Sequence, residues 1–261
     1  MNKIRRSLAI LGANGLLGKD LTRYLADKFD ITPITRENYE HQKEKEFDVF
    51  INANGNSRRF WALQNIYKDF EASTVSVYKT LFDFKFKKYI YFSSVDVYAN
   101  PGRPKNTSED DMIDVSNLNN YGFHKYLSEQ IIKNALDDYI ILRPSMIIGK
   151  NLKKGPFFDI IKGKPLFMTP DSRLQIITTF AISEIISMLT SRMIKNEIFN
   201  IGGEGAVYFV NISEYFEVSI KWSNNAVEQY YEMNVSKLKA QYNLKTSEDY
   251  LKDWLSEQKE V

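Results

Sequence analysis

Three absences in the sequence narrow the chemistry that it can carry out. There is no cysteine, which excludes disulfides, thiolate nucleophiles and cysteine-ligated zinc. The two histidines, His41 and His124, are too few for a three-histidine metal site, and we expect no site built from two histidines and carboxylates either. No run reaches about 18 apolar residues, so no transmembrane helix is predicted.

Signals for export and for polyanionic partners are also missing. The basic start of the chain is followed by a short apolar stretch that Gly12 and Lys19 interrupt, so no signal peptide is predicted. The chain has 35 basic and 33 acidic side chains, a net charge of +2, which indicates no nucleic-acid or membrane partner. We therefore expect a cytoplasmic protein.

The length and composition are typical of a globular protein. The chain has 261 residues, of which 43% are hydrophobic and 26% charged. That length predicts one large domain, or a large domain with a smaller one.

Apolar strands and amphipathic helices alternate through the first 145 residues. Helices are predicted over 17–25, 61–84 and 120–136 because apolar side chains recur at helical spacing. Buried strands are predicted over 7–11, 31–35, 48–53, 88–93 and 139–143. This alternation predicts an α/β fold with a doubly wound parallel sheet.

The pattern changes after Pro144. Strands are predicted near 174–177 and 198–201, and helices near 182–191, 212–218, 235–242 and 247–258. We therefore predict a dinucleotide-binding domain over 1–145. Residues 146–261 are predicted to form a smaller substrate-binding lobe that is partly threaded back onto the sheet.

A glycine-rich loop follows the first predicted strand and opens the first predicted helix. Glycines at 12, 15 and 18 allow a tight turn, close approach of a pyrophosphate to the backbone, and close helix packing. The sequence therefore predicts a dinucleotide site in this loop. Its predicted cofactor-binding residues are Gly12, Asn14, Gly15, Leu16, Leu17 and Gly18.

The end of the second predicted strand distinguishes NADP from NAD. Arg36 follows that strand, and a guanidinium there suits the 2′-phosphate of NADP. Glu37 comes next, and a carboxylate there would suit the 2′-hydroxyl of NAD. We expect NADP(H) in preference to NAD(H).

A tyrosine and a lysine lie four residues apart on the helix predicted over 120–136. This spacing places Tyr121 and Lys125 on one helix face, where the ammonium is expected to lower the pKa of the phenol. Ser94 ends the fourth predicted strand and can bind a substrate oxygen. The three side chains predict general acid–base catalysis.

Five motifs occur in order, and together they resemble a known family. They are residues 12–18, 52–55, 93–98, 121–125 and 142–145, with weaker matches at 173–178, 199–203 and 234–237. They resemble the extended short-chain dehydrogenase/reductases, the NAD-dependent epimerase/dehydratase family of nucleotide-sugar enzymes. The resemblance implies a Rossmann-type fold, a homodimer formed through 61–84 and 120–136, and a place in polysaccharide biosynthesis.

The resemblance also implies a role for each matching residue. Tyr121 would be the catalytic acid/base, Lys125 its partner bound to the nicotinamide ribose, and Ser94 the catalytic hydroxyl. Arg173 would contact the nucleotide diphosphate of the sugar. Further cofactor-lining residues would be Asn52, Ala53 and Gly55, with Pro144 and Ser145 near the nicotinamide.

Departures from the family pattern narrow the reaction. Sugar 4,6-dehydratases carry Thr-Asp-Glu where this chain has Ser94, Val95 and Asp96. Because Val95 cannot protonate a leaving hydroxyl, a dehydratase is not expected, and Asp96 is kept as a substrate-binding residue. The epimerase/reductases that make GDP-fucose need a cysteine, which is absent. The short chain also implies a trimmed sugar-binding lobe.

The sequence therefore favours an NADP(H)-dependent reductase of a nucleotide-linked keto-sugar. An NAD-dependent 4-epimerase of nucleotide sugars uses the same three side chains and stays open as the alternative. A non-catalytic dinucleotide-sensing protein is a more distant alternative, because it predicts loss of a catalytic set that is complete here.

Overall fold

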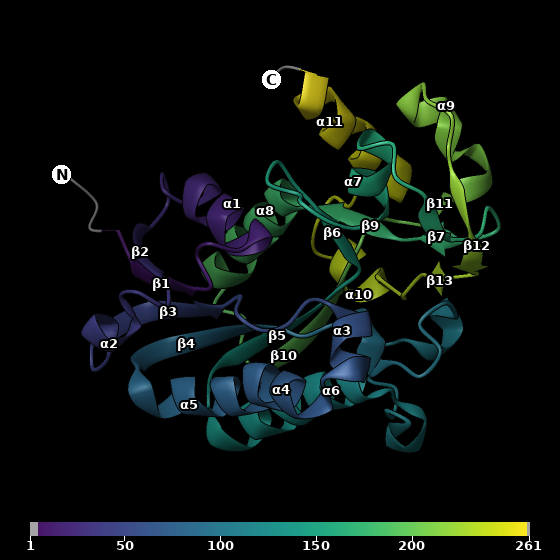
Figure 1. The fold of residues 1–261 in the computed structure, drawn as a ribbon. Helices are drawn as coiled ribbons and strands as arrows, with labels where there is room; N and C mark the ends of the chain where they lie inside the picture. The colour runs from purple at the N-terminus through teal and green to yellow at the C-terminus, as the bar shows by residue number, and fades with distance from the viewer. Residues whose placement is uncertain (1–4, 260–261) are drawn as a thin grey trace.

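A six-stranded parallel sheet forms the centre of the molecule (Figure 1). The computed structural model describes residues 5–259. The strand order is β10-β5-β4-β3-β1-β2, and every neighbouring pair is parallel. The strands are β1 (Ser7–Leu11), β2 (Asp30–Ile34), β3 (Glu46–Asn52), β4 (Lys85–Phe92), β5 (Tyr139–Pro144) and β10 (Glu197–Ile201). The doubly wound parallel sheet predicted from the sequence is confirmed.

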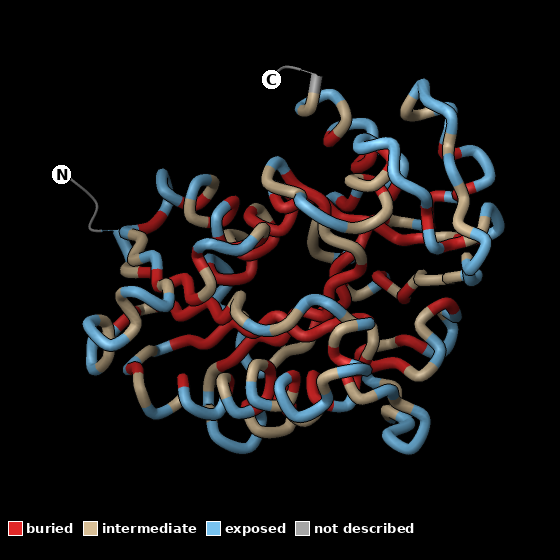
Figure 2. Tube along the Cα trace, viewed as in Figure 1, coloured by how far each residue is buried: buried red, intermediate tan, exposed pale blue. Residues whose placement is uncertain are grey.

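Helices cover both faces of this sheet. On one face, α1 (Leu16–Tyr24) and α8 (Thr179–Ser191) pack over Leu8 and Ile10 of β1. On the other face, α5 (Ser76–Asp83) and α6 (Asn120–Ala135) pack over Ala9 and Leu11 of the same strand. Alternate side chains of one strand therefore enter two separate cores. In Figure 2 the chain of the central strands is mostly coloured as buried.

The helix predicted over 61–84 is wrong as a continuous element. It is divided into α3 (Arg59–Gln64), α4 (Ile66–Phe70), a π-helix (Glu71–Val75) and α5. Asn65 leaves the helical conformation, with φ −131° and ψ 56°, and its side-chain amide donates to the Trp61 carbonyl (3.1 Å). Asparagine side chains compete in this way for backbone groups, and here the competition ends α3. Short α2 (Tyr39–Gln42) precedes β3.

The second half of the chain forms a smaller unit with its own core. Phe157, Phe209 and Trp254 pack together there, and the Trp254 indole donates to the Gly149 carbonyl (2.9 Å). Its elements are α7 (Pro156–Ile161), α9 (Ile212–Phe216), α10 (Ser236–Lys239), α11 (Ser247–Lys259), β6 (Met146–Ile148), β7 (Leu166–Met168), β8 (Arg173–Leu174), β9 (Ile176–Thr178), β11 (Val207–Tyr208), β12 (Trp222–Val227) and β13 (Tyr230–Tyr231). Between these elements the chain returns to the main sheet through α8 and β10.

Some of the helices and strands predicted for this half are present, and others differ from the prediction. The helices near 182–191 and 247–258 and the strand near 198–201 are present, while the helix near 235–242 shortens to α10. The strand predicted over 174–177 divides into β8 and β9 around buried Gln175, and β12 was not predicted. Short 3₁₀ helices lie at Val95–Val97 (η2), Pro104–Asn106, Val115–Asn117 and Phe209–Asn211. Within 5–259, none of the helices has the length and apolar character needed to span a membrane.

A buried ion pair joins the central sheet to α6. The guanidinium of Arg143, on β5, donates to both carboxylate oxygens of Glu129, on α6, over 3.0 and 2.7 Å. The side chain of Arg143 is 2% exposed and that of Glu129 is 0% exposed. A third donor of Arg143 reaches the Tyr98 hydroxyl (2.7 Å). Such a bidentate pair is well paired although it is removed from water.

The same network continues into β10 and the second half of the chain. The Tyr98 hydroxyl donates to Asn200 Oδ1 (2.9 Å). The Asn200 amide donates in turn to the carbonyls of Thr107 (2.6 Å) and Asn234 (2.8 Å). One chain of hydrogen bonds therefore connects α6, β5, β10 and the segment before α10.

Replacing Arg143 with methionine should leave the Glu129 carboxylate buried without its cationic partner. We expect a loss of about 3–5 kcal/mol in the free energy of unfolding, because an unpaired buried charge is strongly destabilising. The double variant Arg143→Met, Glu129→Leu should be less destabilised than Arg143→Met. Urea unfolding of both variants measures this, and a double variant that is the less stable of the two would contradict the interpretation.

Candidate active site

The carboxyl ends of the parallel strands bring the predicted site residues to one edge of the sheet. The strand order reverses between β1 and β3, and in such sheets ligands bind in the crevice outside the carboxyl ends at this reversal. The glycine loop follows β1, and Ala53 follows β3. Ser94 follows β4, and Ser145 follows β5.

The glycine loop has the backbone that close approach of a dinucleotide needs. Gly12 has φ +85°, and a Cβ at this position would lie 2.9 Å from the Ala53 carbonyl oxygen. A Cβ at Gly18 would collide with the Gly12 carbonyl, so a side chain at either position would push the elements apart. Gly15 is the N-cap of α1 and offers no side-chain cap, which leaves N–H groups of the first turn open to a ligand.

The remaining loop residues differ in what they expose. Asn14 and Gly15 are exposed and Leu16 is half-buried. Leu17 is buried in the core between α1 and the sheet, so its side chain does not reach the crevice. Only its backbone can contribute to a ligand site.

The loop after β3 is held by Asn52. Its side chain is fully buried, donates to the Tyr89 hydroxyl (2.7 Å) and accepts from the Asn54 N–H (3.0 Å). Asn52 was predicted to line the cofactor, but its side chain is occupied within the protein. Gly55 has φ +125°, and a Cβ there would lie 3.4 Å from Lys125 Nζ, so this loop faces the catalytic lysine.

Tyr121, Lys125 and Ser94 meet at the start of α6. Asn119 caps this helix by accepting from the Gly122 N–H (3.0 Å). A Cβ at Gly122 would collide with the Asp96 carbonyl oxygen, so only glycine lets the helix approach η2 this closely. The approach brings Tyr121 within hydrogen-bonding reach of Ser94, and both are buried.

Burial is the main cause of the shift in the pKa of Tyr121. Removal from water raises the pKa of Tyr121 well above its usual range, and the Asp96 carboxylate raises it further. Hydrogen bonding with Ser94 acts in the opposite direction but does not reverse the shift. Lys125 is not among the groups that shift this pKa here, so the expected effect of its ammonium on the phenol stays a prediction.

The ammonium of Lys125 is directed at the backbone of β4. It donates to the Phe92 carbonyl (3.0 Å) and lies 5.2 Å from the centroid of the Tyr91 ring. Burial lowers the pKa of Lys125 to about 8, while the carboxylates of Asp69 and Glu129 act in the opposite direction. The lysine thus lies between the end of β4 and Gly55.

Asp96 is held by residues that the sequence did not indicate. Its carboxylate pairs with Arg59 (3.4 Å) and accepts from the hydroxyls of Tyr231 (3.3 Å) and Ser94 (3.1 Å). Arg59 also lies over the Tyr231 ring at 5.4 Å. Because Tyr231 comes from β13, the second half of the chain contacts Asp96 at the candidate site directly. The Arg58-Arg59 dipeptide after the β3 loop was the only signal in the sequence.

Arg173 lies in an aromatic cluster apart from the catalytic side chains. Its guanidinium is 3.9 Å from the Tyr230 ring centroid and 5.2 Å from that of Tyr208, and it donates to the Tyr208 hydroxyl (3.4 Å). Tyr230 precedes Tyr231 in β13, so this cluster adjoins the Asp96 cluster along the chain. Stacking leaves the outer donors of the guanidinium available to an anion.

The other predicted site residues are Arg36, Pro144 and Ser145, which end or follow strands of the sheet. Arg36 is exposed just after β2 and has no hydrogen-bond or ion-pair partner among residues 5–259. Pro144 ends β5. Ser145 is buried, and its N–H donates to the Ile201 carbonyl (2.9 Å).

The residues present fit a dinucleotide. The glycine cradle admits no side chain, and the first turn of α1 has no side-chain cap. The buried hydroxyls of Ser93 and Ser145 have no hydrogen-bond partner within the described part of the chain, although such groups are normally paired. Both follow strands that end at this crevice, so a polar ligand there would satisfy them.

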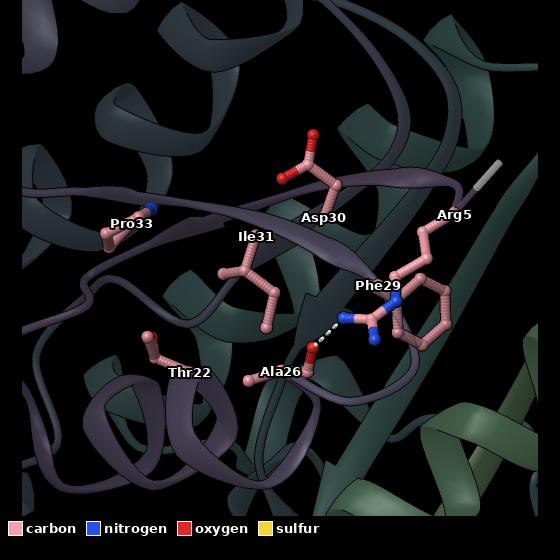
Figure 3. Close-up of a pocket in the computed structure, with 7 residues that line it drawn as sticks. All are labelled: Arg5, Thr22, Ala26, Phe29, Asp30, Ile31 and Pro33. Carbon is pink, nitrogen blue, oxygen red and sulfur yellow. Dashed lines mark hydrogen bonds between the residues drawn. The ribbon is translucent and has the colours of Figure 1, made fainter. Parts of the chain in front are cut away.

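A shallow hollow elsewhere on the surface is not part of this site. It has a volume of about 660 Å³ and is lined by the residues drawn in Figure 3. Asp30 and Ile31 place it at the amino end of β2, whereas the glycine loop lies at the carboxyl end of β1. Arg5 donates to the Ala26 carbonyl across it (2.8 Å).

The sequence pattern of a known family matches this part of the chain. The pattern described as the NAD dependent epimerase/dehydratase family matches residues 8–160, which is more than half of the chain. The chain belongs to this family. It is therefore an NAD(P)-dependent enzyme of the extended short-chain dehydrogenase/reductase type.

Solved structures share the fold at low sequence identity. The dTDP-4-dehydrorhamnose reductase of Bacillus anthracis, in complex with NADP, has a TM-score of 0.81 and 18% identity over 98% of this chain and 100% of its own. A mutant of the UDP-glucuronic acid 4-epimerase of Bacillus cereus was solved in complex with UDP-4-deoxy-4-fluoro-glucuronic acid and NAD. It has a TM-score of 0.76 and 15% identity over 97% of this chain and 99% of its own. RMD from Pseudomonas aeruginosa, complexed with NADPH, has a TM-score of 0.74 and 15% identity over 96% of this chain and 99% of its own. No curated protein matches the sequence significantly.

Proposed function

We propose that this family member is an NADP(H)-dependent reductase of a nucleotide-linked keto-sugar. The observation that carries the proposal is the state of Tyr121. Its phenol is buried beside Asp96, and the Lys125 ammonium is directed at the Phe92 carbonyl. Such a phenol is protonated in the protein without ligands. A reductase needs a protonated group beside the carbonyl oxygen at the start of each turnover, whereas an epimerase first needs a proton acceptor.

Each residue of the crevice has a defined task in the proposed reaction. A bound reduced nicotinamide supplies the hydride that reduces the ketone carbon. Ser94 holds the carbonyl oxygen, and Tyr121, within hydrogen-bonding reach of Ser94, gives that oxygen a proton. Lys125 lies between the β4 carbonyls and Gly55, where its ammonium can bind ribose hydroxyls. The buried position of these groups excludes water from the reacting oxygen.

The cofactor preference rests on Arg36. Its exposed guanidinium, without a partner in the described chain, lies at the end of β2, where this fold binds the adenosine ribose. A free guanidinium suits a 2′-phosphate. The exposed Glu37 is the one observation that favours NAD and thus the 4-epimerase alternative. A tightly held NAD that copurifies with the protein would support that alternative.

The nucleotide-sugar substrate is proposed to lie between the two side-chain clusters. Arg173, stacked on Tyr230, would bind the diphosphate, and Asp96 with Arg59 would contact the sugar near Ser94. Val95 is buried and apolar, so the position that serves as acid in dehydratases offers no proton here. These features support reduction of a keto-sugar rather than loss of water.

An exposed apolar surface supports the proposed homodimer. Phe60, Tyr67, Tyr78 and Phe82, on α3 to α5, are 58%, 73%, 52% and 67% exposed. They lie on the helical layer away from the α1/α8 face (Figure 1). A surface with so many large apolar side chains is typical of an interface. We propose that a second copy of the chain covers it through a two-fold axis.

Replacing Tyr121 with phenylalanine should remove the proton donor and little else. Turnover of a panel of nucleotide-linked keto-sugars with NADPH should fall on the order of 10²–10⁴-fold, a typical loss for general acid catalysis. NADPH titration should give an affinity close to the parent's, because the ring remains. Parent-like turnover of Tyr121→Phe would overturn the assignment of the whole site.

Replacing Arg36 with alanine should weaken NADPH binding roughly 10–100-fold, because one charge-assisted contact to the 2′-phosphate is lost. NADH binding should change little. Fluorescence titration with both cofactors measures the two affinities, and Glu37→Gln serves as a neighbouring control. Equal weakening of both cofactors by Arg36→Ala would show that the arginine is a surface residue only.

Introducing a charge at Phe82 should separate the proposed dimer. Phe82→Asp should elute and scatter light as a monomer at micromolar concentration, whereas the parent should be a dimer. Val210→Asp, at a 61% exposed apolar side chain in the second half of the chain, is the matched control and should remain dimeric. A monomeric parent would refute this part of the proposal.

A further inference from the structure

A buried carboxylate beside the proposed site is not used by the chemistry described above. Asp69, on α4, is 0% exposed. Its carboxylate lies 2.7 Å from His124 Nδ1 and accepts from Asn56 Nδ2 (2.8 Å) and from the Ser73 hydroxyl (3.4 Å). A carboxylate is removed from water at this cost only when its partners are fixed.

The two main partners of Asp69 are sequence neighbours of Lys125 and of the glycine that faces it. His124 directly precedes Lys125 on α6, and Asn56 directly follows Gly55, which faces Lys125 Nζ. Asp69 therefore bridges the loop after β3 and the catalytic helix, the two walls between which the ammonium lies.

The histidine end of this bridge is fixed on several sides. The His124 carbonyl accepts from Thr74 (3.2 Å) and Ser128 (2.8 Å), and its ring contacts Phe70 edge-on at 5.4 Å. Thr74 belongs to the π-helix, which interrupts the regular helix beside the dyad. π-helical turns are often found at functional sites, where they place side chains that a regular helix would not.

Within residues 5–259, Asp69 forms no ion pair with a lysine or an arginine, and its close partner is the His124 ring. Lys125 donates to a backbone carbonyl and makes no ion pair within the described residues. Asp69 is nevertheless the carboxylate that most favours the charged form of Lys125, ahead of Glu129, and it also disfavours ionisation of Tyr121.

We propose that Asp69 is a positioning residue for the active site. Held by His124 and Asn56, its buried carboxylate balances the charge of Lys125 and fixes the Gly55 loop against α6. The inference rests on the proposed function, because it assigns Lys125 and Tyr121 as the groups that must remain protonated.

Other charged or titratable groups face the same side chains and remain in the Asp69→Asn variant. The effect of Asp69 is therefore measured against a constant background. These groups are Asp96 beside η2, Arg59 on α3, Tyr91 on β4, and His124 and Glu129 on α6.

Asp69→Asn should shift the alkaline limb of the pH profile. The carboxylate stabilises protonated Lys125 and opposes ionisation of Tyr121, so its loss lowers both pKa values. Activity that needs both protons should therefore be lost at a pH lower by roughly one unit. The profile of kcat/KM against pH measures this shift. KM for NADPH should rise as well, because the Gly55 loop loses part of its anchor.

Two variants separate charge from packing. His124→Gln keeps the Asp69 carboxylate but removes one of its anchors, so it should move the alkaline limb less than Asp69→Asn does. Asp48→Asn removes a carboxylate that pairs with Ser7 and Lys87 near the opposite end of β3, and should leave the profile unchanged. If Asp69→Asn loses stability but keeps the parent's alkaline limb, its role is structural only and the proposal is overturned.

A titration without turnover keeps this inference distinct from the proposed reaction. The ¹⁵N resonance of Lys125 Nζ, assigned with Lys125→Met, should titrate at lower pH in Asp69→Asn than in the parent. Absence of keto-sugar reduction together with this shift would overturn the proposed function and support the role of Asp69. An unchanged titration would overturn the role of Asp69 whatever the reaction.

Discussion

The buried guanidinium of Arg143 is the group on which the arrangement of the site depends. Its donors are taken up by Glu129 and Tyr98, and Tyr98 in turn holds Asn200. Glu129 lies about two turns along α6 from Tyr121, and Tyr98 closes the segment that begins at Ser94. The interaction that keeps a charge satisfied in the core therefore also fixes the catalytic helix against the end of β4. Stability and catalytic geometry are two consequences of one network.

Burial then decides what the catalytic groups can do. Withdrawal from water favours the neutral forms of both the Tyr121 phenol and the Lys125 amine. The phenol is therefore protonated, whereas the lysine needs a nearby negative charge to remain charged. In our proposal Asp69 supplies that charge without forming an ion pair with Lys125, whose ammonium donates to the Phe92 carbonyl.

The features that depend on local pattern were predictable from the sequence. Five apolar runs gave the strands, and parallel strands bring their carboxyl ends together, so the glycine loop, Ser94 and Tyr121 converge. Contacts between distant segments were not predictable, since nothing in the pattern links Arg59 and Tyr231 to Asp96, or Asp69 to His124. β12 was missed because its side chains are mostly half-buried or exposed and show no alternation. Asn52 was assigned to the cofactor by its motif, yet its side chain holds the turn.

The proposed substrate contacts at Asp96 and Arg173 both involve β13, a strand of the second half of the chain. Tyr230 stacks on Arg173 while the next residue, Tyr231, donates to Asp96, so β13 spans from the proposed diphosphate position to the reacting sugar. Two residues of one strand point to opposite faces, which lets them serve separate parts of one extended ligand. Asp96 pairs with Arg59 and Ser94, and burial raises the pKa of its carboxyl above the usual range. In the proposed reduction the proton comes from Tyr121, whose hydroxyl lies within hydrogen-bonding reach of Ser94.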